Sequence, residues 1–199
     1  MRVFTVFPAL TALFFSATYA QTFPNQSGPY ALKVTSDDAA IDGKYLYACH
    51  SGAAIEQLCL GDKGENPPAF GSYYFNSSDW SEEVNGSKTG VLVWNLPLQD
   101  TFASSALTFS YSPASNVVVV YFIPGDQNAA TIAFDADDKI FMAAYVDDTI
   151  TPGGSKAFYH WQVCNTQFGG YRYQALAWVT VGRPINESCR GVNVTREAT

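Results

Sequence analysis

Short runs of β-branched and aromatic residues recur along this chain and are separated by turn residues. Helical periodicity, with apolar residues three and four positions apart, is almost absent. The pattern predicts an antiparallel β fold with about eleven strands. The expected strand cores are residues 30–35, 44–49, 55–60, 72–75, 90–94, 106–111, 117–123, 130–134, 140–146, 158–164 and 171–181.

The connections between these segments are short and rich in Gly, Pro and Asp, which favours hairpins over helical crossovers. No internal repeat is evident. We therefore predict an all-β, single-domain antiparallel β-sandwich or barrel, with a β-trefoil as second choice. The clearest turn signals lie at residues 41–43, 61–64, 124–126, 135–138, 151–154 and 168–170.

Two segments predict how strands are placed within such a fold. Residues 117–123 are apolar throughout, which is typical of a central strand covered on both faces. In the segment 158–164, alternation places Tyr159, Trp161 and Val163 on one face.

The N-terminus has the three parts of a secretory signal peptide. Arg2 gives a positive start, residues 3–17 are almost continuously apolar, and Thr18-Tyr19-Ala20 offers small residues for cleavage. We expect residues 1–20 to be a signal peptide and residues 21–199 to be a secreted domain. Because the apolar run is shorter than the roughly 20 residues of a membrane span, no membrane insertion is expected.

All four cysteines lie in the predicted mature chain, and an even number in an exported protein predicts two disulfides. Three pairings are possible. We favour Cys49 with Cys59 and Cys164 with Cys189, because each closes a short excursion between neighbouring predicted strands. A structural zinc site is the alternative, but the spacing lacks the close cysteine pairs of such sites.

Five Asn-x-Ser/Thr sequons predict N-glycosylation of an exported chain. Two of them fall in the polar segment 76–89, which we expect to be an exposed loop, as we do for residues 61–71. The candidate acceptors are Asn25, Asn76, Asn85, Asn186 and Asn193.

Charge and motifs argue against several classes of protein. The formal net charge is −7 and the basic residues are scattered, so no nucleic-acid partner is expected. Nucleotide-binding glycine motifs and the His-Glu-x-x-His metalloprotease motif do not occur in the sequence, so no cofactor or metal is expected. Cleavage after Ala20 would expose Gln21, whereas secreted copper polysaccharide oxygenases require an N-terminal histidine.

Catalytic chemistry has few candidates. His50 and His160 are the only histidines, and no Gly-x-Ser-x-Gly elbow is present. His50 follows Cys49, but an oxidised cysteine is no nucleophile. We therefore assign no catalytic residue.

Paired carboxylates are the main enzymatic alternative, since a glycosidase needs two of them about 5–10 Å apart. Glu56 also fits the wet side of a strand, the next two glutamates fit a glycosylated loop, and the aspartates fit a hairpin turn. That turn lacks the Gly and Glu of the known calcium loop. The candidates are Glu56, Glu82, Glu83, Asp135, Asp137 and Asp138.

Aromatic residues make up 15% of the chain, which suggests a glycan-binding surface, because Tyr and Trp can stack on sugar rings while their polar atoms stay wet. Phe168, Tyr171 and Tyr173, around the Gly169-Gly170 turn, are the best candidates for ligand binding. Packing in the core is the competing interpretation.

The arrangement of residues 30–196 resembles that of a known group of proteins. The resemblance is strongest in two segments and at Cys189. They are Tyr45-Leu46-Tyr47-Ala48-Cys49-His50-Ser51-Gly52-Ala53-Ala54 and Gln174-Ala175-Leu176-Ala177-Trp178. The chain resembles ascomycete small secreted proteins of uncharacterised function. The resemblance implies a fungal extracellular or wall-associated protein of a kind that includes effector and elicitor candidates.

Together these features favour a secreted, non-enzymatic glycoprotein that recognises a cell-wall glycan or a host-surface protein. A carbohydrate-active hydrolase and a structural cell-wall protein are the alternatives.

Overall fold

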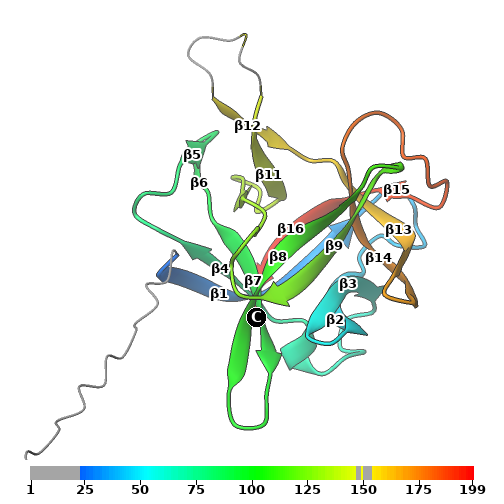
Figure 1. The fold of residues 1–199 in the computed structure, drawn as a ribbon, viewed down its shortest axis with the longest axis horizontal. Helices are drawn as coiled ribbons and strands as arrows, with labels where there is room; N and C mark the ends of the chain where they lie inside the picture. Colours follow the sequence, from blue (N-terminus) through cyan, green and yellow to red (C-terminus); the bar gives the residue numbers. More distant parts are fainter. Residues whose placement is uncertain (1–22, 147–148, 150–153) are drawn as a thin grey trace, which may run out of the picture.

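Antiparallel strands make up nearly all of the regular structure in the computed structural model, which describes residues 23–146, 149 and 154–199 (Figure 1). The predicted all-β class is confirmed, while the predicted signal peptide lies outside the described residues. The elements are β1 (Asn25–Thr35), β2 (Tyr45–Gly52), β3 (Ile55–Gly61), the 3-10 helix η1 (Pro68–Phe70), β4 (Tyr73–Ser77), β5 (Glu83–Val84), β6 (Ser87–Lys88), β7 (Val91–Pro97), β8 (Phe102–Ser112), β9 (Ser115–Pro124), β10 (Ile132–Phe134), β11 (Ile140–Tyr145), β12 (Ser155–Phe158), β13 (Trp161–Phe168), β14 (Tyr171–Val179), β15 (Arg190–Gly191) and β16 (Asn193–Ala198).

Eight strands form a closed barrel in the order β14-β3-β2-β1-β4-β7-β8-β9. Closure comes from β9, which pairs with β14 at Val119↔Ala177 and with β3 at Tyr121↔Gln57. Of the two predicted architectures, the barrel is therefore the one observed. Closing the sheet removes long exposed edges, at which β proteins can pair with one another and aggregate.

The other strands extend this barrel. β13 pairs with the edge of β14 that faces away from β3. β15 pairs with β13, and β16 pairs with β1. β10, β11 and β12 form a separate three-stranded sheet, and β5 and β6 form a short hairpin. In Figure 1 the β7–β8 hairpin projects from the bottom of the barrel, and the β11–β12 region projects from the top.

Three tryptophans belong to the main hydrophobic core. Trp94, Trp161 and Trp178 are each at most 2% exposed. The ring nitrogen of Trp94 donates to the backbone oxygen of Ala69 at 2.8 Å, so its polar atom is satisfied, as burial requires. For these tryptophans, core packing is the correct interpretation.

The segment 158–164 is not one strand, so that prediction is wrong. β12 ends at Phe158 and pairs with β11, whereas β13 begins at Trp161 and pairs with β14. The chain thus changes sheets at Tyr159-His160. Trp161 and Val163 do share the core, but Tyr159 is exposed.

Strand β9 was expected to be covered on both faces. Val118, Val120 and Phe122 point into the barrel and are fully buried, whereas Val119 and Tyr121 on the outer face are only half-buried. The expectation holds for the inner face and in part for the outer one.

The loop predictions differ in outcome. Residues 61–71 do connect β3 to β4 and contain only the short helix η1. Residues 76–89, in contrast, include the end of β4 and the β5–β6 hairpin. A short hairpin can form from a polar segment because Asn85 and Gly86 adopt left-handed backbone conformations at its turn.

Both predicted disulfides are present. Cys49–Cys59 links β2 to β3, and Cys164–Cys189 links β13 to the segment that precedes β15. The predicted pairing is confirmed, and no described cysteine is free.

Candidate functional site

The β13–β14 hairpin ends in a turn that favours glycine at both central positions. Gly169 and Gly170 have φ angles of 58° and 91°, in the left-handed region that two-residue hairpin turns require. A Cβ on Gly169 would lie 2.6 Å from the backbone oxygen of Ser51, whereas nothing lies within 4 Å of a Cβ on Gly170. The turn therefore reverses the chain and also packs closely against the end of β2.

The outer half of this hairpin has two chemically different faces. Phe168 pairs with Tyr171 and Thr166 pairs with Tyr173, and paired residues share a face, so the aromatic side chains lie together. The alternate positions carry amides and one guanidinium. This second face consists of Asn165, Gln167, Arg172 and Gln174.

Two residues from other strands complete a set that we call the aromatic cluster: His50, Tyr121, Phe168, Tyr171 and Tyr173. The rings of Tyr171 and Tyr173 are nearly parallel, with centroids 6.2 Å apart. Phe168 stacks on Tyr121 at 5.2 Å, and His50 meets Tyr171 edge to face at 5.2 Å. The structure thus brings the three predicted residues together and adds His50 and Tyr121.

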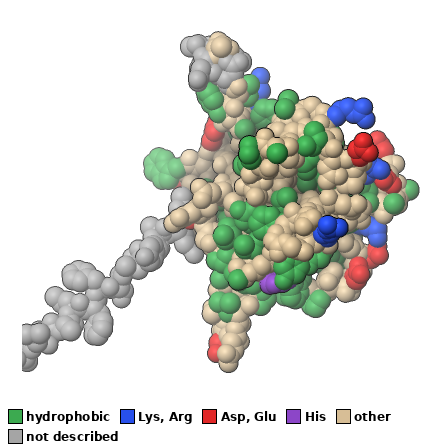
Figure 2. Space-filling view, turned by 45° about the vertical axis from the view of Figure 1, so that its right-hand side comes forward, with side chains coloured by type: hydrophobic (Ala, Val, Ile, Leu, Met, Phe, Trp, Pro, Cys, Tyr) green, Lys and Arg blue, Asp and Glu red, His purple; other side chains and the backbone are tan. Residues whose placement is uncertain are grey.

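The cluster is accessible from solvent. Tyr171 is 36% exposed, His50 is exposed, and the other three rings are half-buried. Figure 2 shows hydrophobic side chains gathered over the central part of the face drawn, while most acidic and basic side chains lie toward the right-hand edge of the molecule. A surface of this kind suits an uncharged ligand with an apolar face.

A buried polar network fixes the hairpin to the barrel. The amide of Gln57, which is fully buried, donates to Ser51 Oγ at 2.9 Å and accepts from Thr166 Oγ1 at 2.8 Å. The hydroxyl of Tyr173 donates to the backbone oxygen of His50 at 2.7 Å. These bonds join β2, β3, β13 and β14, so the aromatic cluster is held on a rigid support.

On the face that carries the amides, opposite the aromatic rings, the hairpin borders a hollow of about 470 Å³, which we call the polar groove. Arg172 Nε donates to Gln167 Oε1 at 3.2 Å, so its charge is partly engaged. The side-chain amides of Asn165 and Gln174 have no hydrogen-bond partner within the described part of the chain. The groove is lined by Asn165, Thr166, Gln167, Arg172, Tyr173 and Gln174.

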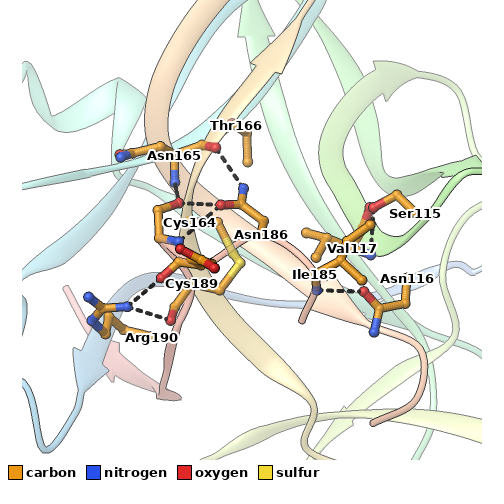
Figure 3. The surroundings of a disulfide bond; sticks show 12 residues. Ser115, Asn116, Val117, Cys164, Asn165, Thr166, Ile185, Asn186, Cys189 and Arg190 are labelled. Carbon is orange, nitrogen blue, oxygen red and sulfur yellow. Dashed lines mark hydrogen bonds between the residues drawn. A yellow bond between two sulfur atoms is a disulfide. The ribbon is translucent and has the colours of Figure 1, made fainter. Parts of the chain in front are cut away.

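The second disulfide supports one end of this groove (Figure 3). Beside Cys164–Cys189, the amide of Asn186 donates to the backbone oxygen of Asn165 at 3.0 Å. Ser188 Oγ accepts from the Asn165 backbone N–H at 2.9 Å and donates to Asn186 Oδ1 at 2.7 Å. Two side chains of a predicted glycosylation sequon therefore serve to position Asn165.

The other predicted glycosylation acceptors lie at the surface or near it. Asn25 and Asn193 are exposed on β1 and β16, and Asn85 is exposed in the β5–β6 turn. Asn76 is half-buried on β4. Their glycosylation remains a prediction.

Glu56 does not lie on the wet side of its strand, so that interpretation is wrong. It shares the inner face of β3 with Leu58 and is only 5% exposed. Its Oε2 atom has no hydrogen-bond partner among the described residues, and burial raises the pKa of this carboxyl to about 7. In the β2–β3 register it lies opposite His50, inside the barrel rather than in the polar groove.

The three aspartates between β10 and β11 form a turn, as expected. Asp135 Oδ1 accepts from the backbone N–H groups of Asp137 and Lys139, both at 2.9 Å. The Asp138 carboxylate pairs with Arg196 at 2.8 Å. These contacts give the carboxylates structural roles.

Glu82 and Glu83 lie at the β5–β6 hairpin, where Glu82 accepts from Ser155 Oγ at 2.9 Å and Glu83 is exposed.

In the described residues, no group of three His, Cys, Asp or Glu side chains could hold a metal ion. Among those same residues no helix has the length and apolar character to cross a bilayer.

His160, the other histidine, is used in packing. Its ring stacks on Trp178 with centroids 5.3 Å apart, and its Nδ1 lies 3.1 Å from the backbone oxygen of Val179. It lies directly before β13, at the end of the hairpin opposite the Gly169-Gly170 turn.

Comparison with known proteins places the whole fold in one family. The model described as "Domain of unknown function (DUF7907)" matches residues 27–198. The chain belongs to this family. The DUF7907 domain thus includes the aromatic cluster, the polar groove and both disulfides.

A curated relative of this DUF7907 chain is the cell wall protein RHD3 of Candida albicans. The two are 28% identical over 114 residues, which cover 57% of this chain and 48% of the relative. The chain thus spans about half the length of that relative. No solved structure matches the chain. The resemblance to fungal proteins of uncharacterised function is confirmed in this coarse form.

Proposed function

We propose that this protein is a non-enzymatic component of the fungal cell wall that binds a wall polysaccharide through the aromatic cluster and the polar groove. The observation that carries the proposal is the pair of parallel Tyr171 and Tyr173 rings on one face of a hairpin whose other face carries the amides of the polar groove. A sugar ring has an apolar C–H face and an edge of hydroxyl groups. Aromatic faces suit the first, and amide donors and acceptors suit the second, so the two faces of the hairpin would contact different units of the polysaccharide.

Other features support this proposal. The hairpin is held by a buried hydrogen-bond network and a disulfide, so binding would order few side chains. The similarity to a fungal cell wall protein favours a wall location, and disulfides suit an oxidising extracellular space.

Co-sedimentation of the mature protein with insoluble β-glucan and chitin tests the proposal. We expect retention on at least one of them, and Tyr171→Ala should weaken it about tenfold, which corresponds to about 1.4 kcal/mol. The matched control is Tyr145→Ala, which removes a tyrosine that is 59% exposed on β11, outside the aromatic cluster, and should bind as the wild type does.

Two results would contradict the proposal. Retention by neither polysaccharide would remove glycan binding and leave recognition of a host-surface protein as the other hypothesis. Release of new reducing ends during the incubation would indicate a hydrolase instead of a binding protein.

A further inference from the structure

A second hollow, of about 400 Å³, lies beside the aromatic cluster. It is bounded by the outer face of β8 and β9 and by the loop that follows β9. Tyr121 belongs to both places, because it lines this hollow and also stacks on Phe168 of the hairpin. The two surfaces therefore meet at one aromatic ring.

The loop that forms the wall of the hollow is fixed at both ends on β8. The backbone N–H of Gly125 donates to the oxygen of Ser104 at 2.9 Å, and the N–H of Ala130 donates to the oxygen of Leu107 at 2.8 Å. Asn128 has a φ of 63°, in the left-handed region that asparagine tolerates better than most residues. The shape of the hollow is therefore set before any ligand arrives.

Three consecutive side chains of this loop are open to a ligand. Asp126, Gln127 and Asn128 are exposed, and none makes a side-chain hydrogen bond within the described part of the chain. Two amides and one carboxylate provide donors and acceptors for hydroxyl groups, while Tyr121 and Pro124 provide apolar contact.

The charge of the hollow limits the ligand class. The residues that line it include one carboxylate, Asp126, and no lysine or arginine. Phosphates and acidic sugars would therefore meet repulsion without a compensating cation. A neutral, hydroxyl-rich ligand fits this chemistry.

We propose that this hollow is a second subsite for the same polysaccharide, so that the ligand is an extended internal stretch of a neutral glycan chain running across Tyr121. The inference rests on the proposed function. It adds that recognition depends on chain length and that residues 126–128 contact sugar units beyond those held at the hairpin.

Isothermal titration with soluble oligomers of two and six units tests this inference, using β-1,3-linked glucose and β-1,4-linked N-acetylglucosamine. For one series, the wild type should bind the hexamer at least tenfold more tightly than the dimer. Asn128→Gly tolerates the left-handed backbone and removes the side chain with its amide, and it should weaken hexamer binding severalfold while leaving dimer binding unchanged. Tyr171→Ala should weaken both.

The matched control is Asn85→Gly, the same substitution at another exposed, left-handed asparagine with a φ of 53°, in protein produced without glycans. It should bind both oligomers as the wild type does, and thermal melts would verify folding of all variants. Equal affinity for dimer and hexamer, or an unchanged hexamer affinity in Asn128→Gly, would overturn the second subsite and leave the hairpin site intact. Absence of binding to every oligomer, or an unchanged affinity in Tyr171→Ala, would count against the proposed function itself.

Discussion

Glu56 links the chemistry of a single residue to the stability of the fold. Its carboxyl is buried in the barrel with one oxygen unpartnered, and burial raises its pKa from 4.5 to about 7. The folded protein therefore keeps this proton to higher pH than the unfolded chain does. The protonated Glu56 carboxyl therefore contributes fully to the free energy of unfolding below about pH 4.5. This contribution is lost as the pH rises through about 7, because the buried carboxyl then has to ionise.

We predict that Glu56→Gln removes this pH dependence. The variant should match the wild type near pH 4 and exceed its unfolding free energy by about 3 kcal/mol near pH 8, because the amide never has to ionise. Urea unfolding at a series of pH values measures the difference. Glu83→Gln, at an exposed position on β5, is the control for the change in net charge. Parallel stability curves for Glu56→Gln and the wild type would contradict the prediction.

Thr166 offers a second test at the residue scale. Its hydroxyl donates to the fully buried amide oxygen of Gln57, so Thr166→Val keeps the shape and leaves that oxygen unpaired. We expect a loss of about 1–3 kcal/mol in the free energy of unfolding. Thr35→Val, at an exposed position on β1, should change it little. Equal effects of the two substitutions would argue against the network.

The hairpin turn can be tested at the scale of elements. Gly169→Ala and Gly170→Ala both place a Cβ on a left-handed backbone, but only the first also places it 2.6 Å from the backbone oxygen of Ser51. Gly169→Ala should therefore be the more destabilising by at least about 1 kcal/mol, measured by urea unfolding. Indistinguishable stabilities would mean that the turn does not pack on β2 as described.

Local signals in the sequence were sufficient for this hairpin and for the disulfides. The Gly169-Gly170 pair marks a two-residue turn, such a turn pairs Phe168 with Tyr171 on one face, and cysteine spacing favours the observed disulfides. His50 and Tyr121 were missed as members of the cluster, because only long-range strand pairing brings them to the hairpin.

Where sequence interpretation failed, the deciding contact was non-local. Alternation continues across Tyr159-His160, although the pairing partner changes there from β11 to β14. Strand β16 is largely polar and was missed; it forms because β1 provides an edge that pairs Val34 with Val194. Glu56 is followed by the equally polar Gln57, so the pattern could not show which of the two faces the interior.

For the molecule as a whole, the proposal predicts where the protein is found. If the aromatic cluster binds a wall polysaccharide, the wild type should remain with washed cell walls, and Tyr171→Ala should move into the culture fluid. Immunoblotting of the two fractions measures this distribution. Equal retention of both forms would indicate that the wall holds the protein by another route.

The most direct measurement of the central claim is amide chemical-shift mapping of the isotopically labelled protein during titration with a soluble oligosaccharide. The account predicts shifts confined to residues 165–174 and to the neighbourhoods of His50, Tyr121 and residues 126–128. Shifts concentrated elsewhere, or no shifts with any of the wall oligosaccharides, would contradict it.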